Sequence, residues 1–467
     1  MAKLNSITTR TFFRLIFTLS VIVFFSCRKD KENPTPPGPI VEDSLYQQYG
    51  TPFTEIPEIE NIVMYEVNLR AFSPSGDLLG VIDRLDELAD LKVSVIWLMP
   101  IHPIGLVNSV NSPYSVRDYK AVSEEYGTLN DLRTLTDEAH ARGMAVIMDW
   151  VANHTSWDNE WISNKSWYTQ DGNGNIIHPA GTNWQDVADL NYSNQIMRKA
   201  MIDAMKYWVY EANVDGFRCD YADGVPFDFW KEAIESIRSI SGRNFIFFAE
   251  GARNDHFTAG FDLNFSWKFY EAVKDVFSGN AVSSIFSADS AEYASTPPGK
   301  QWVRFTTNHD ESAWDATPVS LFDGIDGALA ASMVTVFTGG VPLIYGSQEV
   351  GTAANVPFFY NSTINWDSHP EMLLTYKKML QFYGTSQTAK SGQIKVYEHN
   401  DVACFKKKLI DDEIVIMVNL RNEPVNYTIP SELKNIQWYE VFNEDFITLG
   451  NQTTLEPYQF LLLKKPL

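Results

Sequence analysis

The sequence contains few cysteines. Only three of its 467 residues are cysteine. Cys219 lies inside an apolar, strand-like run that should be buried, which argues against a disulfide with Cys404. We therefore expect both residues to belong to the core rather than to act as metal ligands or nucleophiles.

Positive charge is also scarce. The chain has 37 lysine and arginine residues against 59 aspartate and glutamate residues, a net charge of −22. Such a surface repels phosphate backbones, which argues against a nucleic-acid partner. The charge is compatible with an uncharged substrate, because electrostatic steering would bring nothing to it, but solubility alone would explain the charge equally well.

Long apolar runs are absent except near the start of the chain. The stretch 15–25 is apolar but too short to span a bilayer, and Ser26 and Cys27 follow it. Three basic residues precede it: Lys3, Arg10 and Arg14. Residues 1–26 therefore resemble a bacterial lipoprotein signal peptide, with Cys27 as the lipidated first residue of the mature chain. The alternative is ordinary secretion, with Cys27 discarded or left free.

The region that follows, 27–55, is polar and rich in proline. Its stretch 33–39 is typical of a stiff tether that would hold a globular part away from a membrane. Several acyl chains on Cys27 would give firm anchoring. The resemblance implies a bacterial cell envelope location, and we expect the outer membrane. The charged RKDKE after Cys27 favours export to the outer surface, with the periplasmic face as the alternative.

Short apolar strands alternate with helical patterns over residues 56–388, as in a parallel sheet. The predicted strands are 62–68, 93–98, 144–149, 214–220, 244–250, 261–265, 302–307 and 341–345. Their nearly continuous apolar character is typical of strands that are covered on both faces. The length of the chain suits a large barrel with an accessory domain.

Two helices between these strands have recognisable patterns. Thr128 and Asp131 resemble a capping box at the start of the first, and Gly143 closes it. Four residues at a spacing of four are expected to form the buried stripe of the second: Ile196, Ala200, Ala204 and Trp208.

Two further regions depart from this alternation. The connection 154–193 is too long for a plain loop and is rich in Trp, Asn, Asp and Gly, which favours a functional role. Over 389–467 the pattern changes to alternating strands, at 393–400, 402–409, 413–420, 424–429, 437–442 and 459–465. This pattern predicts a C-terminal antiparallel β-sandwich.

Four segments carry the strongest functional signal: DWVANH (149–154), GFRCD (216–220), FIFFAE (245–250) and FTTNHD (305–310). Asp220, Glu250 and Asp310 each stand where a parallel strand would pass into its loop. Acids at the carboxyl ends of barrel strands can meet in one pocket although they are far apart in the sequence.

The four segments, in this order, resemble the conserved regions of the α-amylase superfamily of glycoside hydrolases (glycoside hydrolase family 13), and the resemblance covers about residues 55–467. It implies a (β/α)8 TIM barrel with a small inserted domain after strand 3, here 154–193, and a C-terminal β-sandwich. It also implies that Asp220 is the nucleophile, Glu250 the acid/base and Asp310 the third acid, which grips sugar hydroxyls. Cleavage with retention requires two carboxyls about 5–5.5 Å apart.

The local sequence supports this division of roles. Arg218 lies two residues before Asp220, so both side chains point to the same face, and the guanidinium favours the ionised carboxylate. The apolar residues before Glu250 favour its protonated form. The resemblance further implies that His154 and His309 bind sugar hydroxyls.

By the same resemblance, Tyr114 forms a stacking platform beneath the sugar that is cleaved. Five aromatic residues crowd the inserted region: Trp157, Trp161, Trp167, Tyr168 and Trp184. We expect one or two of them to line the cleft and the others to pack within the insertion.

The resemblance implies no organic cofactor, and it raises the question of calcium. Asn153 and Asp189 match positions that often supply oxygens to a structural Ca²⁺, with a backbone carbonyl near Gly224 as a third ligand. Some family members have the same residues and no ion, so the sequence leaves both alternatives open.

One departure from the family bears on specificity. Many α-amylases carry Lys-His just after the nucleophile segment to bind the sugar beyond the cleavage point, and Asp223-Gly224 stand there instead. The expected function is a retaining glycosidase that cleaves α-glucosidic bonds, mainly α-1,4, in starch-like glucans or maltooligosaccharides. The alternatives are an α-1,6 or neopullulanase-type hydrolase, a glucanotransferase, or a non-catalytic glucan-binding protein. The sequence does not define an oligomeric state.

Overall fold

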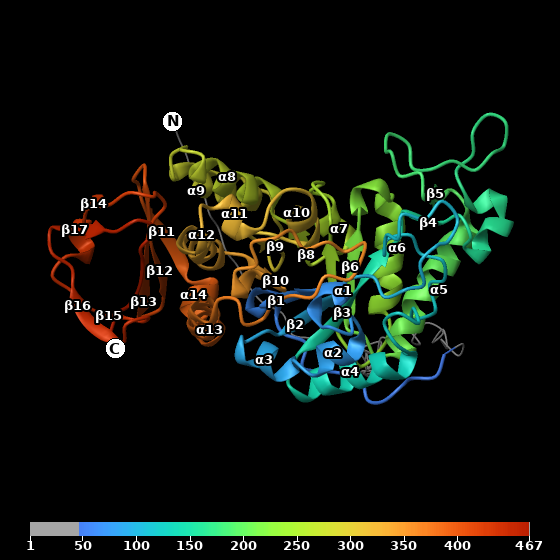
Figure 1. Ribbon diagram of the computed structural model, residues 1–467, viewed down its shortest axis with the longest axis horizontal. Coiled ribbons are helices and arrows are strands. Elements are labelled where there is room, and N and C mark those ends of the chain that lie inside the picture. Colours follow the sequence, from blue (N-terminus) through green and yellow to red (C-terminus); the bar gives the residue numbers. More distant parts are fainter. Residues whose placement is uncertain (1–45, 467) are drawn as a thin grey trace, which may run out of the picture. The chain divides into compact units, whose positions relative to one another are not determined.

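Eight parallel strands close into a barrel in the order β1-β10-β9-β8-β7-β6-β3-β2 (Figure 1). This is a computed structural model that describes residues 46–466, so the predicted signal peptide, Cys27 and most of the predicted tether lie outside the described residues. The barrel strands are β1 (Met64–Val67), β2 (Val95–Leu98), β3 (Ala145–Val151), β6 (Gly216–Asp220), β7 (Ile246–Ala249), β8 (Leu263–Phe265), β9 (Gln301–Arg304) and β10 (Val341–Tyr345). All eight predicted strands are present, and the predicted barrel is confirmed.

The strands are apolar throughout because their alternate residues belong to two different cores. In β7, Ile246 and Phe248 point into the barrel, where they pack with Trp97 of β2. Phe247 and Ala249 point outward into the layer of helices. A strand buried on both faces has no solvent-facing position, so it reads as a continuous apolar run.

Helices cover the outside of the barrel. They are α1 (Leu69–Phe72), α2 (Leu78–Ile82), α3 (Leu85–Asp90), α4 (Leu129–Ala141), α5 (Gln195–Glu211), α6 (Phe227–Arg238), α7 (His256–Ala259), α8 (Trp267–Phe277), α9 (Ser283–Tyr293), α10 (His309–Trp314), α11 (Pro318–Leu321), α12 (Ile325–Thr338), α13 (Pro370–Thr385) and α14 (Gln387–Ser391). Among the residues that the structure describes, none of them is both long and apolar enough to cross a bilayer.

The two predicted helix patterns have different outcomes. The capping box is confirmed, because Thr128 accepts from the backbone of Asp131 and the Asp131 side chain accepts from the backbone of Thr128. The stripe predicted for α5 is wrong at its start, where Ile196 is 67% exposed. Three methionines one position further on are buried instead: Met197, Met201 and Met205. A spacing of four drifts around a helix of 3.6 residues per turn, so it follows the buried face only over part of the helix.

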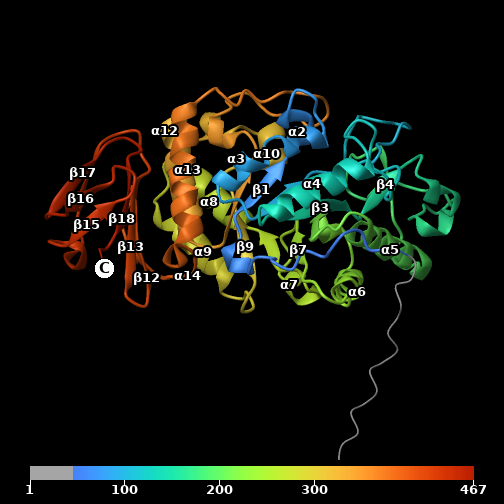
Figure 2. The ribbon, with the colours of Figure 1, turned by 90° about the horizontal axis from the view of Figure 1, so that it is seen from below.

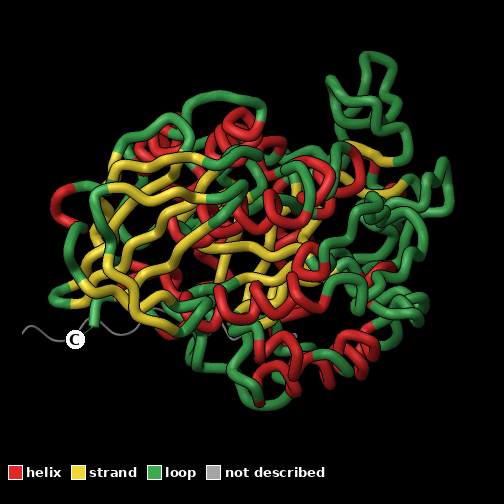
Figure 3. The backbone as a smooth tube through the Cα atoms, turned by 60° about the vertical axis from the view of Figure 1, so that its left-hand side comes forward, coloured by secondary structure: helices red, strands yellow, loops and turns green. Residues whose placement is uncertain are grey.

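The predicted insertion separates β3 from α5. It consists mostly of loops (Figure 3) with the short antiparallel pair β4 (His154–Ser156) and β5 (Val187–Asp189), in which His154 pairs with Asp189. Two short 3-10 helices, Glu160–Ser163 and Lys165–Trp167, lie between these strands in the sequence.

Antiparallel strands form the C-terminal part of the chain. The sheet of β11 (Gln393–Tyr397), β12 (Val402–Leu409), β13 (Asp412–Asn419), β18 (Phe460–Lys464), β15 (Gln437–Glu440) and β16 (Asp445–Thr448) faces a second sheet of β14 (Val425–Thr428) and β17 (Gln452–Leu455). Its other face contacts the barrel through α12 and α14 (Figure 2). Phe405 and Ile416 belong to the apolar core of the barrel helices, whereas Cys404 and Met417 face the second sheet. The predicted sandwich is confirmed, with β16 and β17 in addition to the strands that the pattern predicts.

The two cysteines within the described residues are as expected. Cys219 and Cys404 are both buried free thiols. Burial raises the pKa of each thiol, so neither has the character of a reactive thiolate.

Candidate active site

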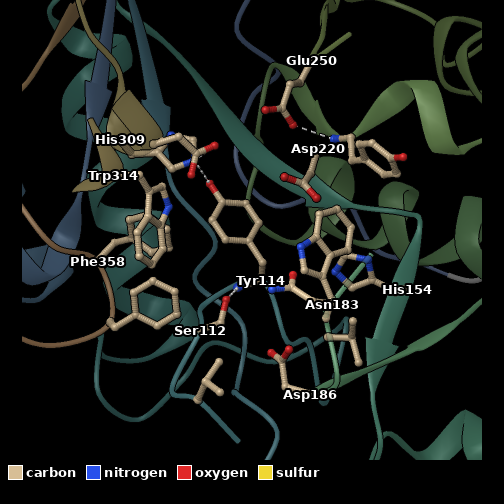
Figure 4. Close-up of a pocket in the computed structure, with 16 residues that line it drawn as sticks. Ser112, Tyr114, His154, Asn183, Asp186, Asp220, Glu250, His309, Trp314 and Phe358 are labelled. Carbon is tan, nitrogen blue, oxygen red and sulfur yellow. Dashed lines mark hydrogen bonds and ion pairs between the residues drawn. The ribbon is translucent and has the colours of Figure 1, made fainter. Parts of the chain in front are cut away.

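A cavity of about 610 Å³ opens over the carboxyl ends of the barrel strands (Figure 4). Its lining combines acids, histidines and aromatic rings: Val110, Ser112, Tyr114, His154, Asn183, Trp184, Asp186, Val187, Asp220, Tyr221, Glu250, His309, Asp310, Trp314, Phe358 and Phe359. The three predicted catalytic acids are therefore on the same side of the barrel and face one solvent-accessible space.

Arg218 holds two of these acids together. Its Nη1 lies 3.0 Å from Asp220 Oδ1, and its Nη2 lies 2.9 Å from Glu250 Oε2. Nη1 also donates to both oxygens of Asp149, at 2.8 and 2.9 Å. The guanidinium is fully buried, so breaking one of these contacts would leave a charge unpaired away from water, and this cost holds the carboxyls in their relative positions.

The ionisation of Asp220 differs from the sequence-based expectation. Burial raises the pKa of Asp220 well above its usual range, and the negative charge of Glu250 raises it further. Arg218 lowers the pKa, as expected, but does not outweigh these effects. The ionised form of Asp220 is therefore a poorly solvated carboxylate, whose negative charge is stabilised when it bonds to an electrophilic carbon.

Glu250 is positioned by the turn that follows Asp220. The backbone N–H of Tyr221 donates to Glu250 Oε2 at 2.7 Å, and the N–H of Ala222 donates to the Glu250 carbonyl at 2.8 Å. Tyr221 adopts a left-handed backbone conformation (φ 40°) to do so. Arg218 and Tyr221 both contact Oε2, so Oε1 is the oxygen available to a ligand.

Asp310 is not at a strand end, contrary to the prediction. Strand β9 stops at Arg304, and Asp310 lies in the first turn of α10. The side chain of Asn308 accepts from Glu311 N at 2.9 Å and so caps that helix. The cap starts the helix at His309, directly before Asp310. From this first turn the Asp310 side chain, which is 39% exposed, still lines the cavity.

A chain of polar contacts crosses the floor of the cavity. His309 Nδ1 lies 2.5 Å from Glu66 Oε1, and His309 Nε2 lies 2.8 Å from the Tyr114 hydroxyl. That hydroxyl donates to Asp149 Oδ2 at 3.1 Å. The chain connects β1 to β3 and holds the ring of Tyr114 in place below Asp220 and Glu250 (Figure 4).

The two predicted sugar-binding histidines differ in charge. Burial opposes protonation of His309, but the negative charges of Asp310 and Glu66 outweigh it and raise the pKa of His309 to about 9. Burial lowers the pKa of His154 to about 4. At neutral pH His309 is therefore an imidazolium that donates from both nitrogens, whereas His154 is neutral.

Several residues of the site are absent from the sequence-based prediction. Glu66 is an acid within the apolar run 62–68, and Asp149 is the last residue of the predicted strand 144–149, so both carried a detectable signal. The aromatic residues Trp314, Phe358 and Phe359 lie outside the four motifs, and only the fold brings them to the cavity. Of the five aromatic residues in the insertion, Trp184 lines the cavity, within the number expected.

The residues proposed for calcium lie close together. A Cβ atom added to Gly224 would be 2.5 Å from Asn153 Oδ1, and Gly224 and Asp189 line one cavity of about 480 Å³. Burial raises the pKa of Asp189, so a cation would stabilise its charged form. Amide, carboxylate and carbonyl oxygens are the donors that Ca²⁺ prefers, and the set fits this ion in donor type.

The fold and the site together define a barrel glycosidase in which paired carboxyls face an aromatic-lined cavity. The alpha amylase catalytic-domain family matches residues 42–186 and 164–378. The chain therefore belongs to the alpha-amylase family.

Relatives and solved structures agree with this assignment. Alpha-amylase 3 of Dictyoglomus thermophilum is 25% identical over 490 residues, covering 88% of this chain and 94% of its own length. The crystal structure of an alpha-amylase from Lactobacillus plantarum superposes with a TM-score of 0.79 at 26% identity, covering 88% of this chain and 100% of that one. The maltogenic alpha-amylase AmyB of Thermotoga neapolitana gives the same four values.

Proposed function

We propose that this protein is a retaining glycosidase that hydrolyses α-glucosidic bonds, mainly α-1,4, in starch-like glucans or maltooligosaccharides. The observation that carries the proposal is the contact of one buried guanidinium, Arg218, with both Asp220 and Glu250. The alpha-amylase names of the relatives support the class of substrate.

The reaction would proceed in two displacements. In the first, an Asp220 oxygen bonds to the anomeric carbon while the bond to the leaving oxygen breaks, and Glu250 gives that oxygen its proton. In the second, Glu250 takes a proton from water, the water oxygen bonds to the anomeric carbon, and Asp220 leaves. Asp310 and His309 would hold hydroxyls of the distorted sugar, and Tyr114 would stack beneath it.

The alternative outcomes concern the bond and the acceptor. Asp223 and Gly224 replace the Lys-His pair of many α-amylases, so the leaving-group side is built differently. Because of this difference, the second candidates are an α-1,6 or neopullulanase-type hydrolase and a glucanotransferase. Two digestions separate these candidates. From maltoheptaose, hydrolysis gives only shorter products, whereas transfer also gives chains longer than maltoheptaose. From pullulan, α-1,6 cleavage gives maltotriose.

The first prediction concerns Asp220→Asn. We expect this change to lower sugar release from maltoheptaose at least about 10³-fold, because the neutral amide cannot form the glycosyl intermediate. Maltoheptaose binding, measured by calorimetry, should persist. Undiminished release by Asp220→Asn would end the proposal, and a wild-type protein that binds glucan without turnover would be a glucan-binding protein.

We also propose a structural calcium ion held by Asn153 Oδ1, the Asp189 carboxylate and the Gly224 carbonyl. The ion would cross-link the insertion to the loop after β6, and it would take no part in bond cleavage. Thermal unfolding after chelation should occur at lower temperature and be restored by Ca²⁺ in the wild type but not in Asp189→Ala. If neither the chelator nor added Ca²⁺ changes the unfolding temperature of the wild type, the proposal is contradicted.

We further propose that the protein is a lipoprotein of the bacterial cell envelope, anchored through Cys27 to the outer membrane. The order of basic residues, apolar stretch and Ser26-Cys27 supports this. Detergent phase partitioning of cell extracts should place the wild type in the detergent phase and Cys27→Ser in the aqueous phase. Equal partitioning of the two proteins would rule out the anchor.

A further inference from the structure

The residues directly after Asp220 form an unusual aromatic element. Tyr221 is a non-glycine residue in the left-handed region, a strained conformation for an aromatic side chain. Its backbone N–H contacts Glu250, and its side chain is 37% exposed and lines the cavity. This backbone conformation therefore has two effects: it orients Glu250, and it exposes the aromatic ring of Tyr221 beside Glu250.

Gly224 provides the space in which this ring lies. A Cβ atom on Gly224 would be 2.4 Å from Cε1 of Tyr221, closer than atoms can approach. Any other residue at position 224 would displace the Tyr221 ring. The glycine that stands in the place of the family's Lys-His pair is thus a condition for the position of Tyr221.

Asp223 is directed away from the cavity. Its carboxylate accepts from Ala252 N at 2.9 Å and Arg253 N at 3.3 Å, and it pairs with His256 Nε2 at 2.7 Å. These contacts tie down the loop that follows Glu250. Asp223 is absent from the cavity lining, so neither residue of the pair 223–224 offers a polar group to a sugar there.

Trp184 completes an aromatic wall with Tyr221. The two rings meet edge to face, with centroids 5.2 Å apart, and Trp184 also packs against His154 at 5.5 Å. On the opposite side of the cavity, Trp314 and Phe358 lie across Tyr114 from His154 (Figure 4). The cavity therefore has two separate aromatic walls, one on each side of the acids.

The proposed chemistry identifies which wall meets the leaving group. Glu250 donates its proton to the leaving oxygen, so the departing sugar lies on the Glu250 side. Tyr221 contacts Glu250 through its backbone, whereas His309 and Asp310 bind the sugar that remains on Asp220. The wall formed by Trp184 and Tyr221 is therefore adjacent to the departing sugar.

We propose that Trp184 and Tyr221 form the binding surface for the sugar on the leaving-group side, in place of the Lys-His pair. This inference rests on the proposed function. The surface would recognise the C–H face of a glucose ring by stacking rather than its hydroxyls by hydrogen bonds. The two residues would thus determine specificity for substrates that carry a sugar beyond the cleavage point.

The test compares two substrates that differ in the leaving group. Maltotriose places a sugar on the leaving-group side when its terminal glucose departs, whereas in α-maltosyl fluoride a fluoride ion departs and no sugar lies there. We expect Trp184→Ala to lower the ratio of kcat/KM for maltotriose to kcat/KM for α-maltosyl fluoride about tenfold. Trp184→Phe, which keeps an aromatic ring, should restore most of the ratio.

Control variants make the result decisive. Phe446 is 53% exposed on β16 and is not part of the cavity lining, so Phe446→Ala should leave the ratio at its wild-type value. If Trp184→Ala does not fold, Trp184→Leu replaces it, with the same fall expected. A wild-type ratio in the folded non-aromatic variant would overturn the inference alone. A wild-type protein that turns over neither substrate would overturn the proposed function and the inference with it.

Discussion

At the scale of single residues, the site depends on one buried cation surrounded by acids. Arg218 is fully buried and contacts Asp149, Asp220 and Glu250. Three carboxylates so close together would repel one another, and the planar guanidinium can bind several of them at once. Lysine offers a single point charge, so Arg218→Lys would not preserve this arrangement.

The raised pKa of Asp220 leads to a prediction about stability. A folded-state pKa above the unfolded value means that the folded protein binds the proton more tightly, so stability falls as the pH rises through that range. Asp220→Asn removes this penalty at neutral pH. We expect the unfolding temperature of the variant to be about 1–3 °C above that of the wild type at pH 7. The gain should disappear near pH 4, and a lower unfolding temperature at pH 7 would contradict the prediction.

A second prediction concerns the charge of His309. Its folded-state pKa of about 9 lies above the ordinary value, so its contribution to stability is fully present below about pH 6.5 and is lost as the pH rises through about 9. Glu66→Gln removes one of the two charges that favour protonation. NMR titration of the His309 ring should therefore give a lower pKa in the variant, and the alkaline limb of the activity profile should move to lower pH.

Glu349→Gln provides the matched control for this prediction. Glu349 is also a buried acid, but its hydrogen bonds go to Tyr65 and the backbone of Ser347 rather than to His309. Its replacement should leave the titration of His309 as in the wild type. An equal effect of both substitutions would mean that Glu66 acts through general destabilisation.

At the scale of elements, the approach of β6 to β7 is closer than a side chain would permit. A Cβ atom on Gly216 would lie 1.9 Å from the backbone oxygen of Ile246, and Gly216 has φ +151°. Since the obstacle is backbone of a barrel strand, neither partner can move without opening the sheet. The motif that carries Asp220 thus begins with a glycine for a structural reason.

Gly216→Ala should therefore be strongly destabilising. We expect a loss of more than about 3 kcal/mol in the free energy of unfolding, measured by denaturant titration. Gly143→Ala is the control, because Gly143 also has positive φ (+74°) but nothing within 4 Å of an added Cβ. It should cost only about 1–2 kcal/mol. Equal losses would show that strand contact is not the cause.

At the scale of the whole molecule, a buried lysine marks the contact between the C-terminal sheet and the barrel. Lys407 of β12 is 2% exposed, and its Nζ donates to the backbone carbonyls of Ala389 and Lys390. Burial lowers the pKa of Lys407 to about 8. The sheet is thus joined to the barrel through a cation that is costly to keep charged.

This arrangement predicts a pH dependence that Lys407→Met should abolish. Between about pH 8 and the unfolded value of 10.5 the unfolded chain binds more protons at Lys407, so stability rises with pH. The wild type should gain up to about 3 kcal/mol relative to Lys407→Met as the pH rises from 7 to 10. The difference between the two unfolding curves isolates this residue, because other groups titrate equally in both proteins. A difference independent of pH would contradict the prediction.

The sequence by itself determined the barrel, the order of its strands and the segments that end in acids. Strands buried on both faces carry apolar residues at nearly every position, so short segments of the sequence are enough to predict them. The carboxyl ends of parallel strands lie at the same end of the barrel, so residues that follow them come together there. The resemblance to the α-amylase superfamily could be recognised from the sequence because each of its motifs is a short, continuous segment.

Only the tertiary structure decided which side chains meet across the cavity and how strongly each acid or base is charged. Glu66 and His309 are 243 residues apart, and Trp184 comes from the insertion to meet Tyr221. Burial and Coulomb interactions act over a few ångströms of space rather than along the chain. For this reason the local pattern placed Arg218 beside Asp220 correctly, while the net effect on the pKa of Asp220 depended on the folded surroundings.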